Sequence, residues 1–302
     1  MDLQEKLKAL RKQTGMSQEQ LAEKLHVSRQ AVTKWETGTG LPDLENLRAL
    51  AAIFQVSVDE LLAAPGAAPA APEFLYESVT EYDVDAKKDY DITFTGASSL
   101  ALAGYDGEKL RVRLASNEIA ELQCAFKVKL DDIKRRLDVD VRRVGGVSET
   151  QARSSLHLFL FLPRQYTGQV DVSGNLDELR ITGLETENLE FSGKTGTVRL
   201  ADCAFHCELN SNEDLAVYCQ NFTGQLDFNQ VSAVSRLLLP PETHFQAVTK
   251  GLANKILYER DGAPCDAFSL PAQSEEDSAL VVELNGLKSE LVIAAAPRQA
   301  QP

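Results

Sequence analysis

Four residues between positions 203 and 219 have side chains that can coordinate zinc: Cys203, His206, Cys207 and Cys219. The segment CAFHCEL alternates as a β-strand does, and successive side chains of a strand point to opposite faces. Cys203 and Cys207 would then share one face and His206 the other, so the three would not converge on one ion. We therefore expect no metal ligand here, and we expect the cysteines to pack as small apolar core residues. A metal site or a redox sensor is the alternative.

Other residue patterns that could support catalysis are incomplete. The sequence GKTGT from Gly193 is similar to the end of a phosphate-binding loop, but that motif needs glycine where Asn188 stands, and it must lead into a helix. No HExxH or GxSxG sequence occurs. The four histidines are too far apart in sequence to suggest a catalytic triad: His26, His157, His206 and His244. We expect no catalytic residue, no cofactor and no enzymatic activity.

Length and charge limit what these residues can belong to. A chain of 302 residues corresponds to about two domains. The net charge is −14, but residues 1–62 hold eight Lys and Arg against nine Asp and Glu, so the acidity belongs to the remainder. A nearly neutral N-terminal segment can still bind nucleic acid.

The sequence predicts a cytoplasmic protein without a membrane segment. Its longest apolar run, over residues 156–163, is eight residues long, whereas about twenty are needed to span a bilayer. The N-terminal stretch MDLQEKLKALRK is charged and has no apolar core of a secretory signal. Five cysteines in a long chain are typical of a reducing compartment.

Residues 1–62 have the pattern of five short helices. Leucines recur at helical spacing in this segment, and serines stand where helix caps are expected, at Ser17, Ser28 and Ser57. Residues 63–73 contain the sequence AAPGAAPAAP, whose prolines favour an extended linker. A short tail, residues 297–302, is expected to be disordered.

From residue 74 to residue 296 the apolar period changes from helical spacing to two. Short strands begin about every nine to eleven residues, and glycines separate them. Strands at this spacing without helices between them indicate an all-β domain, and the short fixed period favours a β-solenoid or β-roll over a β-sandwich. Residues 280–294 are expected to form a closing hairpin with its turn near Asn285 and Gly286.

The sequence LRKQTGMSQEQLAEKLHVSRQAVTKWETG, with its continuation LPDLENLRALAAIFQVSVDELL, resembles the Cro/C1-type (XRE) helix-turn-helix family. This resemblance covers residues 1–62 and implies a lambda-repressor-like fold. It also implies a recognition helix over residues 28–36 that lies in the major groove of double-stranded DNA.

The resemblance implies particular roles for residues in this segment. Gln18 would bind a DNA phosphate at the N-terminus of its helix, where backbone N–H groups favour an anion. Arg29 could read guanine and Gln30 adenine. The full set of expected DNA contacts is Gln18, Ser28, Arg29, Gln30, Thr33 and Lys34. Arg11 and Glu36 are expected to form a structural ion pair, and Trp35 to pack in the core.

The C-terminal segment resembles, with less specific motifs, a bacterial β-strand-repeat family described as adhesin-like (the DUF4097 type). The resemblance rests on LALAGYDGEKLRVRL, LHLFLFLPRQY and VELNGLKSELVI. It implies a β-solenoid or β-roll but no ligand.

Together these patterns predict a transcriptional regulator, of the repressor kind, that binds operator DNA as a homodimer. The β domain would sense a ligand, oligomerise or bind a partner. The alternative is an interaction protein whose β domain binds a protein or polymer, with the helix-turn-helix as a localising or antitoxin-like module.

Overall fold

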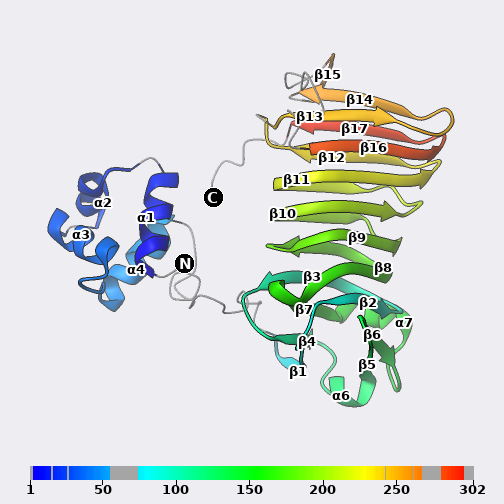
Figure 1. Ribbon diagram of the computed structural model, residues 1–302, viewed down its shortest axis with the longest axis horizontal. Helices are drawn as coiled ribbons and strands as arrows, with labels where there is room; N and C mark the ends of the chain where they lie inside the picture. The colour runs from blue at the N-terminus through cyan, green and yellow to red at the C-terminus, as the bar shows by residue number, and fades with distance from the viewer. Residues whose placement is uncertain are drawn as a thin grey trace. The chain divides into compact units, whose positions relative to one another are not determined.

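The computed structural model describes residues 3–14, 16–25, 27–54, 74–241, 243–260, 262–266 and 280–295. These residues form two compact units, one helical and one of β-strands, with the boundary after Pro72 (Figure 1). The expected fifth helix, the linker over 63–73 and the tail over 297–302 lie outside the described residues. Within the described ranges, no helix is both long and apolar enough to cross a membrane.

The helical unit contains helices α1 (Leu3–Gln13), α2 (Gln18–Lys24), α3 (Arg29–Thr37) and α4 (Leu44–Phe54). Serine hydroxyls cap two of them, because Ser17 accepts a hydrogen bond from the Gln20 amide and Ser28 accepts one from the Ala31 amide. Helix α3 ends at Gly38, whose φ of 74° is in the left-handed region that glycine adopts without a Cβ clash. These caps fix where α2 and α3 begin and where α3 stops.

All four helices contribute apolar side chains to one core, and α3 packs against both α1 and α2. Trp35 is buried in this core, as expected of a packing residue. The remaining buried members are Leu7, Leu21, Ala22, Leu25, Val32, Leu50, Ala51 and Phe54.

The β unit is built almost entirely of strands. They are β1 (Tyr76–Asp83), β2 (Lys88–Phe94), β3 (Ala97–Tyr105), β4 (Lys109–Ser116), β5 (Phe126–Ile133), β6 (Arg136–Arg143), β7 (His157–Pro163), β8 (Thr167–Thr182), β9 (Glu185–Lys194), β10 (Thr197–Asn210), β11 (Ala216–Val231), β12 (Val234–Leu239), β13 (Phe245–Thr249), β14 (Lys255–Arg260), β15 (Ala263–Cys265), β16 (Leu280–Leu287) and β17 (Glu290–Ala295). Two short helices, α6 (Leu122–Ala125) and α7 (Glu149–Ser155), and the 3-10 turn η1 (Arg164–Tyr166) complete the unit.

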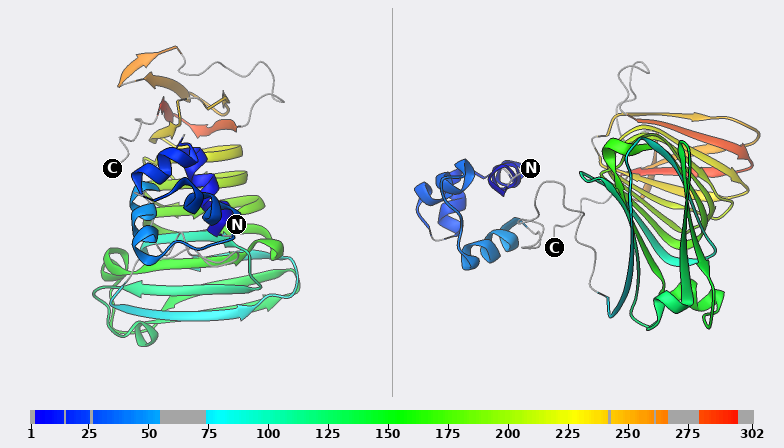
Figure 2. Two further views of the ribbon diagram at one scale, coloured as in Figure 1. Left: turned by 90° about the vertical axis from the view of Figure 1, so that its left-hand side faces the viewer. Right: turned by 60° about the horizontal axis from the view of Figure 1, so that its bottom comes forward.

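Strand pairing follows two series, and one continuous apolar core joins them. The first series runs β5, β6, β2, β8, β9, β10, β11, β16, β13. The second runs β1, β4, β7, β3, β8, β10, β11, β12, β17, β14, β15. The long strands β8, β10 and β11 enter both series, so the chain passes repeatedly from one layer to the other (Figure 2).

From β8 to β11, paired residues of one layer are about 19 residues apart in sequence, as Val170 with Leu189 and Cys207 with Leu226. The predicted spacing of nine to eleven residues therefore separates strands of opposite layers. Each stretch of about 19 residues contributes one predicted strand to each layer. The all-β prediction is confirmed for this unit.

The closing hairpin predicted for residues 280–294 is wrong. Strands β16 and β17 do not pair with each other: β16 lies parallel between β11 and β13, and β17 lies parallel between β12 and β14. The turn falls at Lys288, with a φ of 53°, rather than at Asn285 and Gly286. An Asn-Gly pair within an alternating sequence is also compatible with a strand that continues through it before the chain passes to the other layer.

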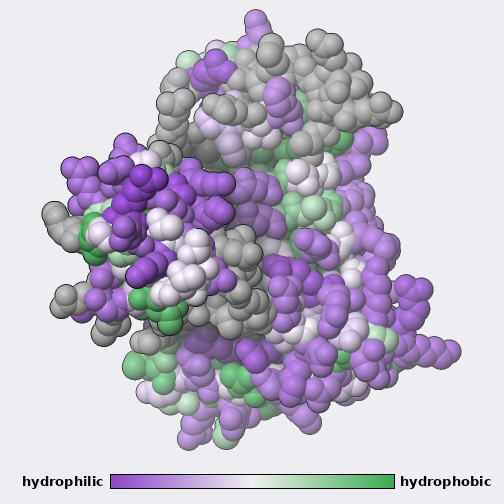
Figure 3. All heavy atoms as spheres, turned by 60° about the vertical axis from the view of Figure 1, so that its left-hand side comes forward, coloured by the Kyte–Doolittle hydropathy of each residue, from purple (hydrophilic) through white to green (hydrophobic). Residues whose placement is uncertain are grey.

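On the face of the molecule visible in Figure 3, hydrophilic side chains predominate over the β unit. This agrees with the strand alternation, because residues such as Val170 and Val172 are fully buried while Asp171 between them is exposed.

Candidate nucleic-acid interface

Helix α3 presents a polar, solvent-exposed face. Arg29, Gln30 and Lys34 are exposed, and Thr33 is half-buried. Ser28 lies at the N-terminus, where its hydroxyl caps the helix 3.2 Å from the Ala31 amide. The predicted contact residues of α3 are thus on one short, capped helix, with long side chains free to reach a partner.

A buried ion pair holds α3 against α1. Arg11 Nε lies 2.5 Å from Glu36 Oε1, and Arg11 Nη2 lies 3.0 Å from Glu36 Oε2. The Glu36 side chain is 2% exposed and that of Arg11 11%. Arg11 Nη1 also donates to the Met16 carbonyl at 2.8 Å, which fixes the turn before α2. The bidentate geometry is that of a strong guanidinium–carboxylate pair.

The electrostatics of this pair favour the charged forms. Burial by itself would raise the pKa of Glu36, but hydrogen bonds from Arg11 and Gln18 and the charges of Arg11 and Lys8 outweigh it and lower the pKa. The hydrogen bond from Arg11 to Glu36 raises the pKa of the guanidinium. Glu36 is therefore a buried structural anion where α1, α2 and α3 meet.

Gln18 extends the pair into a network that sequence reasoning missed. Its Nε2 donates to Glu36 Oε2 at 2.8 Å, and its Oε1 accepts from the Thr33 hydroxyl at 3.3 Å. Since Gln18 is the first residue of α2, this network joins α2 to the middle of α3. One amide hydrogen of Gln18 is left over for the predicted phosphate contact, and the network fixes the direction of the side chain.

A second contact missed from sequence involves Arg29. Its Nη1 lies 3.7 Å from Glu19 Oε2, with both side chains more than half exposed. Such a pair is weak in water. Arg29 is therefore held loosely beside α2 and remains available to an anionic or base-edge partner.

In the β unit the cysteines lie where core packing was expected. Cys203, Cys207 and Cys219 are buried and free, and burial raises the pKa of each thiol. His206 points to the outer face, where its Nε2 lies 3.0 Å from Asp227 Oδ2. Across the described residues, no three His, Cys, Asp or Glu side chains are grouped as a metal site.

The structure does bring one serine and one histidine together, which their separation in sequence gave no reason to expect. Ser99 Oγ lies 2.8 Å from His157 Nδ1 across the paired strands β3 and β7. Burial, followed by the charge of Arg180, lowers the pKa of His157. The Phe74 ring packs 4.8 Å from the imidazole. The pair lies on a sheet surface beside an aromatic ring. This setting does not indicate a catalytic role for it.

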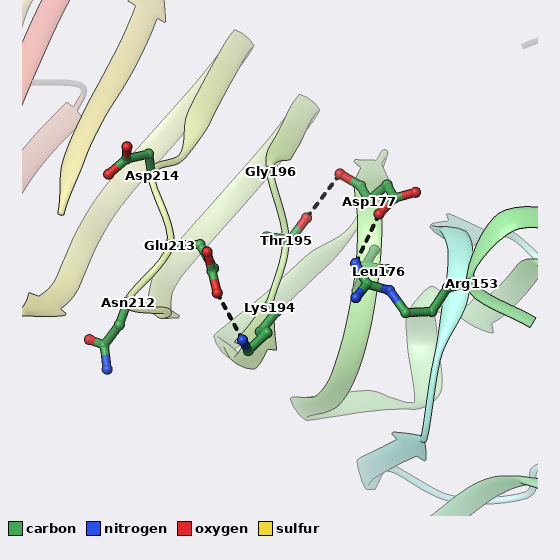
Figure 4. Close-up of a pocket in the computed structure, with 9 residues that line it drawn as sticks. All are labelled: Arg153, Leu176, Asp177, Lys194, Thr195, Gly196, Asn212, Glu213 and Asp214. Carbon is green, nitrogen blue, oxygen red and sulfur yellow. Dashed lines mark hydrogen bonds and ion pairs between the residues drawn. The ribbon is translucent and has the colours of Figure 1, made fainter. Parts of the chain in front are cut away.

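A hollow of about 440 Å³ lies at turns between the two layers of the β unit (Figure 4). Its charged side chains pair with each other: Arg153 with Asp177 and Lys194 with Glu213, each at 3.1 Å. Asp214 accepts a hydrogen bond from the Val234 amide. These groups hold the turns together, so the hollow points to no particular ligand.

The outer face of the first layer carries a row of carboxylates at one register position. Adjacent members face each other across paired strands, about 4.8 Å apart. Burial, followed by the charges of Glu190, Asp91 and Asp89, raises the pKa of Asp171 in this row. The row consists of Asp131, Asp138, Asp91, Asp171, Glu190, Glu208, Asp227 and Glu283.

Comparison with known families identifies the helical unit. Residues 7–61 match a family model described as helix-turn-helix. The helical unit is a helix-turn-helix domain. The predicted resemblance to the Cro/C1-type family is confirmed for this domain. In it, α2 and α3 form the helix-turn-helix pair, and the Gln18–Glu36–Arg11 network spans them and α1.

Two curated regulators are similar to the N-terminal part of the chain. The HTH-type transcriptional activator BcrR of Enterococcus faecalis is 38% identical over 103 residues, which is 34% of this chain and 47% of that protein. The cryptic phage CTXphi transcriptional repressor RstR of Vibrio cholerae is 38% identical over 61 residues, which is 20% of this chain and 54% of that protein. The chain spans about half the length of these relatives.

Solved structures similar to the β unit include a proposed adhesin from Bacteroides fragilis, at a TM-score of 0.41 and 11% identity, covering 73% of this chain and 97% of that one. A proposed cell adhesion protein from Clostridium sporogenes scores 0.35 at 11% identity, covering 72% of this chain and 99% of that one. Scores and identities this low assign no function to the β unit.

Proposed function

We propose that this protein is a sequence-specific, DNA-binding regulator of transcription that inserts α3 into the major groove of operator DNA. The observation that carries the proposal is the exposed face of α3, with Arg29, Gln30 and Lys34 on a helix fixed by the Arg11–Glu36 pair. Arginine pairs with guanine and glutamine with adenine through two hydrogen bonds each, and each such pair discriminates by about 1–3 kcal/mol. The match of residues 7–61 supports the assignment.

The proposed DNA contacts have distinct roles. Gln18 would bind a backbone phosphate through its free amide hydrogen, close to the N-terminus of α2. Arg29 and Gln30 would read base edges, Thr33 and Lys34 would contact a base or a phosphate, and Ser28 would approach the backbone at the helix cap. We propose two copies on two half-sites, about 34–36 Å apart, in the cytoplasm.

The proposed sign of regulation is repression, by covering a promoter. One matched relative is named an activator and the other a repressor, so the sign needs its own test. A reporter gene placed behind the operator should lose expression when the protein is supplied. Increased expression would make the protein an activator.

We assign the β unit, which we propose to be a β-solenoid-like scaffold, no enzymatic role. Its carboxylate row would repel DNA phosphates, so this unit is proposed to serve assembly or partner binding. This row also favours the second candidate function, an interaction protein whose β unit binds a protein or polymer while the helix-turn-helix localises it.

Fluorescence anisotropy with the full chain tests the proposal. The probe is the region upstream of the protein's own gene, with a scrambled duplex as control. Preference for the native probe, lost in Arg29→Ala/Gln30→Ala and kept in the exposed control Arg48→Ala, is the expected result. Equal binding to both probes that is indifferent to the double substitution would overturn the proposal in favour of the interaction protein.

A further inference from the structure

The β unit has an open sheet edge at β5. This strand pairs antiparallel with β6, and across the described residues no strand pairs with its other side. An unpaired edge leaves backbone N–H and C=O groups ready to pair with another strand. Native proteins protect such edges or use them for assembly.

The side chains of β5 leave both faces of the strand incompletely covered. On the core side, Val128 and Leu130 are only half-buried although they pack against the apolar core. On the outer side, Lys127 and Lys129 are exposed, and Ile133 is 53% exposed. An added strand would cover Val128 and Leu130 further and would continue the sheet.

The charges of β5 are complementary to a second copy of itself. In an antiparallel pair of identical strands with Leu130 opposite Leu130, each Lys129 stands opposite the Asp131 of the other copy. Lys127 then stands opposite Ile133, whose apolar surface its methylene stem can cover. Opposite charges directly across a sheet stabilise the pair, and like charges destabilise it.

Among the neighbouring registers, only this one sets opposite charges across the pair without also setting like charges opposite one another. Because successive side chains point to opposite faces, the pairing register can shift only by steps that keep outer residues opposite outer residues. The neighbouring registers place Lys129 opposite Lys129, beside two Lys127–Asp131 pairs, or Asp131 opposite Asp131. The sequence of β5 therefore selects the register centred on Leu130.

The carboxylate row gives an independent reason for a cation at this position. Asp131 is the last member of the row, and on the β6 side it faces another carboxylate, Asp138. Along its own strand it pairs with Lys129. A lysine of a second copy would approach Asp131 from the open side, while Arg136 already pairs with Asp138.

A second open edge, at β1, lacks this complementarity. Strand β1 pairs with β4, and within the described part of the chain it has no further strand partner. Its outer residues are Glu77, Val79, Glu81 and Asp83. No outer residue of β1 is a lysine or arginine that could stand opposite a carboxylate of a second copy. Its own carboxylates already pair with cations of β4: Glu77 with Arg113, Glu81 with Arg111 and Asp83 with Lys109.

We propose that the chain forms a two-fold dimer in which β5 of one copy pairs antiparallel with β5 of the other, centred on Leu130. The partner is a second copy of this chain, and the contact is isologous, so each copy gives the same residues. The inference goes beyond the proposed function, because it names the dimerising segment. It does not depend on DNA binding.

Sedimentation velocity of the full chain without DNA, over a range of micromolar concentrations, tests the dimer. The wild type is expected to show a concentration-dependent monomer–dimer equilibrium. Lys129→Asp places Asp opposite Asp at two symmetry-related positions and should raise the dimer Kd about tenfold or more. Asp131→Lys should do the same through Lys opposite Lys.

The charge swap Lys129→Asp/Asp131→Lys restores opposite charges across the two-fold axis and should return the Kd to near its original value. Val79→Asp, on the open edge at β1, is the matched control and should leave the Kd unchanged. Circular dichroism of each variant confirms that the β unit is folded.

A wild type that sediments as a monomer at every concentration overturns the proposal. So does a dimer whose Kd is unchanged by both single charge reversals, or one that the charge swap fails to restore. Because no DNA is present, these outcomes are separate from those of the anisotropy experiment.

Discussion

The two units of this protein place charge in opposite ways. The helix-turn-helix domain buries one carboxylate, Glu36, and surrounds it with donors from Arg11 and Gln18. The β unit leaves its carboxylates outside and lets the strand register bring like charges together, as at Asp171 and Glu190. A single buried pair positions one helix, whereas the surface row sets carboxylates side by side, with cations such as Arg136 and Lys250 paired to some of them. The buried pair therefore sets the geometry of one helix, and the surface row shapes the electrostatic potential around the β unit.

The largest expected effect of a single substitution is on the buried pair. Glu36→Ala leaves the Arg11 guanidinium buried without its partner and should destabilise the helix-turn-helix domain by about 3–5 kcal/mol. Thermal unfolding followed by helical circular dichroism measures it. The control is Glu19→Ala, which removes only the exposed partner of Arg29 and should change stability by about 0.5 kcal/mol or less. Equal effects of the two substitutions would show that burial makes no difference here.

A smaller effect is expected in the β core. Cys207 is fully buried between Leu189 and Leu226 of the neighbouring strands. Cys207→Ser places a hydroxyl there and should cost about 1–3 kcal/mol in the unfolding of the β unit. Cys124→Ser, at an exposed thiol, is the control and should be neutral within about 0.5 kcal/mol. An unchanged free energy of unfolding in Cys207→Ser would contradict the placement of this side chain in a water-free core.

The third prediction concerns the exposed face of α3. Lys34→Ala should weaken DNA binding to native and scrambled probes alike and lower the salt slope of log K by about one unit, if Lys34 contacts a phosphate. Anisotropy at several salt concentrations measures the slope, with Lys12→Ala on α1 as the control. A loss confined to the native probe would instead make Lys34 a base-reading residue.

The smallest effect is expected in the carboxylate row, and its pH dependence has the opposite sign to that of Glu36. Asp171→Asn relieves like-charge repulsion and should stabilise the β unit by roughly 0.2–0.5 kcal/mol at neutral pH. Because the folded pKa of Asp171 is raised above its ordinary 3.8, the penalty is present above the folded pKa and disappears as the pH falls to 3.8. The gain from the substitution should fade over the same range.

For Glu36 the folded pKa is lowered below its ordinary 4.5. Its contribution to stability is complete above pH 4.5 and is lost as the pH falls through the folded pKa. Acid titration of unfolding in the wild type and in Asp171→Asn distinguishes the two signs. A gain from Asp171→Asn that grows toward pH 4 would contradict the assignment of like-charge repulsion to the row.

Much of the helix-turn-helix domain was predictable because its signals are local. Ser17 and Ser28 cap the helices they precede, Gly38 ends α3, and the leucine spacing identifies the core face. The Arg11–Glu36 pair followed from the family resemblance. The bond from Gln18 to Glu36 did not, because nothing in the sequence shows that an expected phosphate ligand also hydrogen-bonds inside its own domain.

In the β unit the sequence by itself determined strand alternation, the burial of the cysteines and the divergence of His206 from them. Only the tertiary structure decided which strands are neighbours. That choice placed β16 and β17 as parallel strands in different layers instead of in a closing hairpin. It also placed Ser99 beside His157 and aligned carboxylates from eight strands in one row. The physical reason is that alternation sets which side of a strand a residue occupies, whereas register across strands 19 residues apart is set by packing of the whole core.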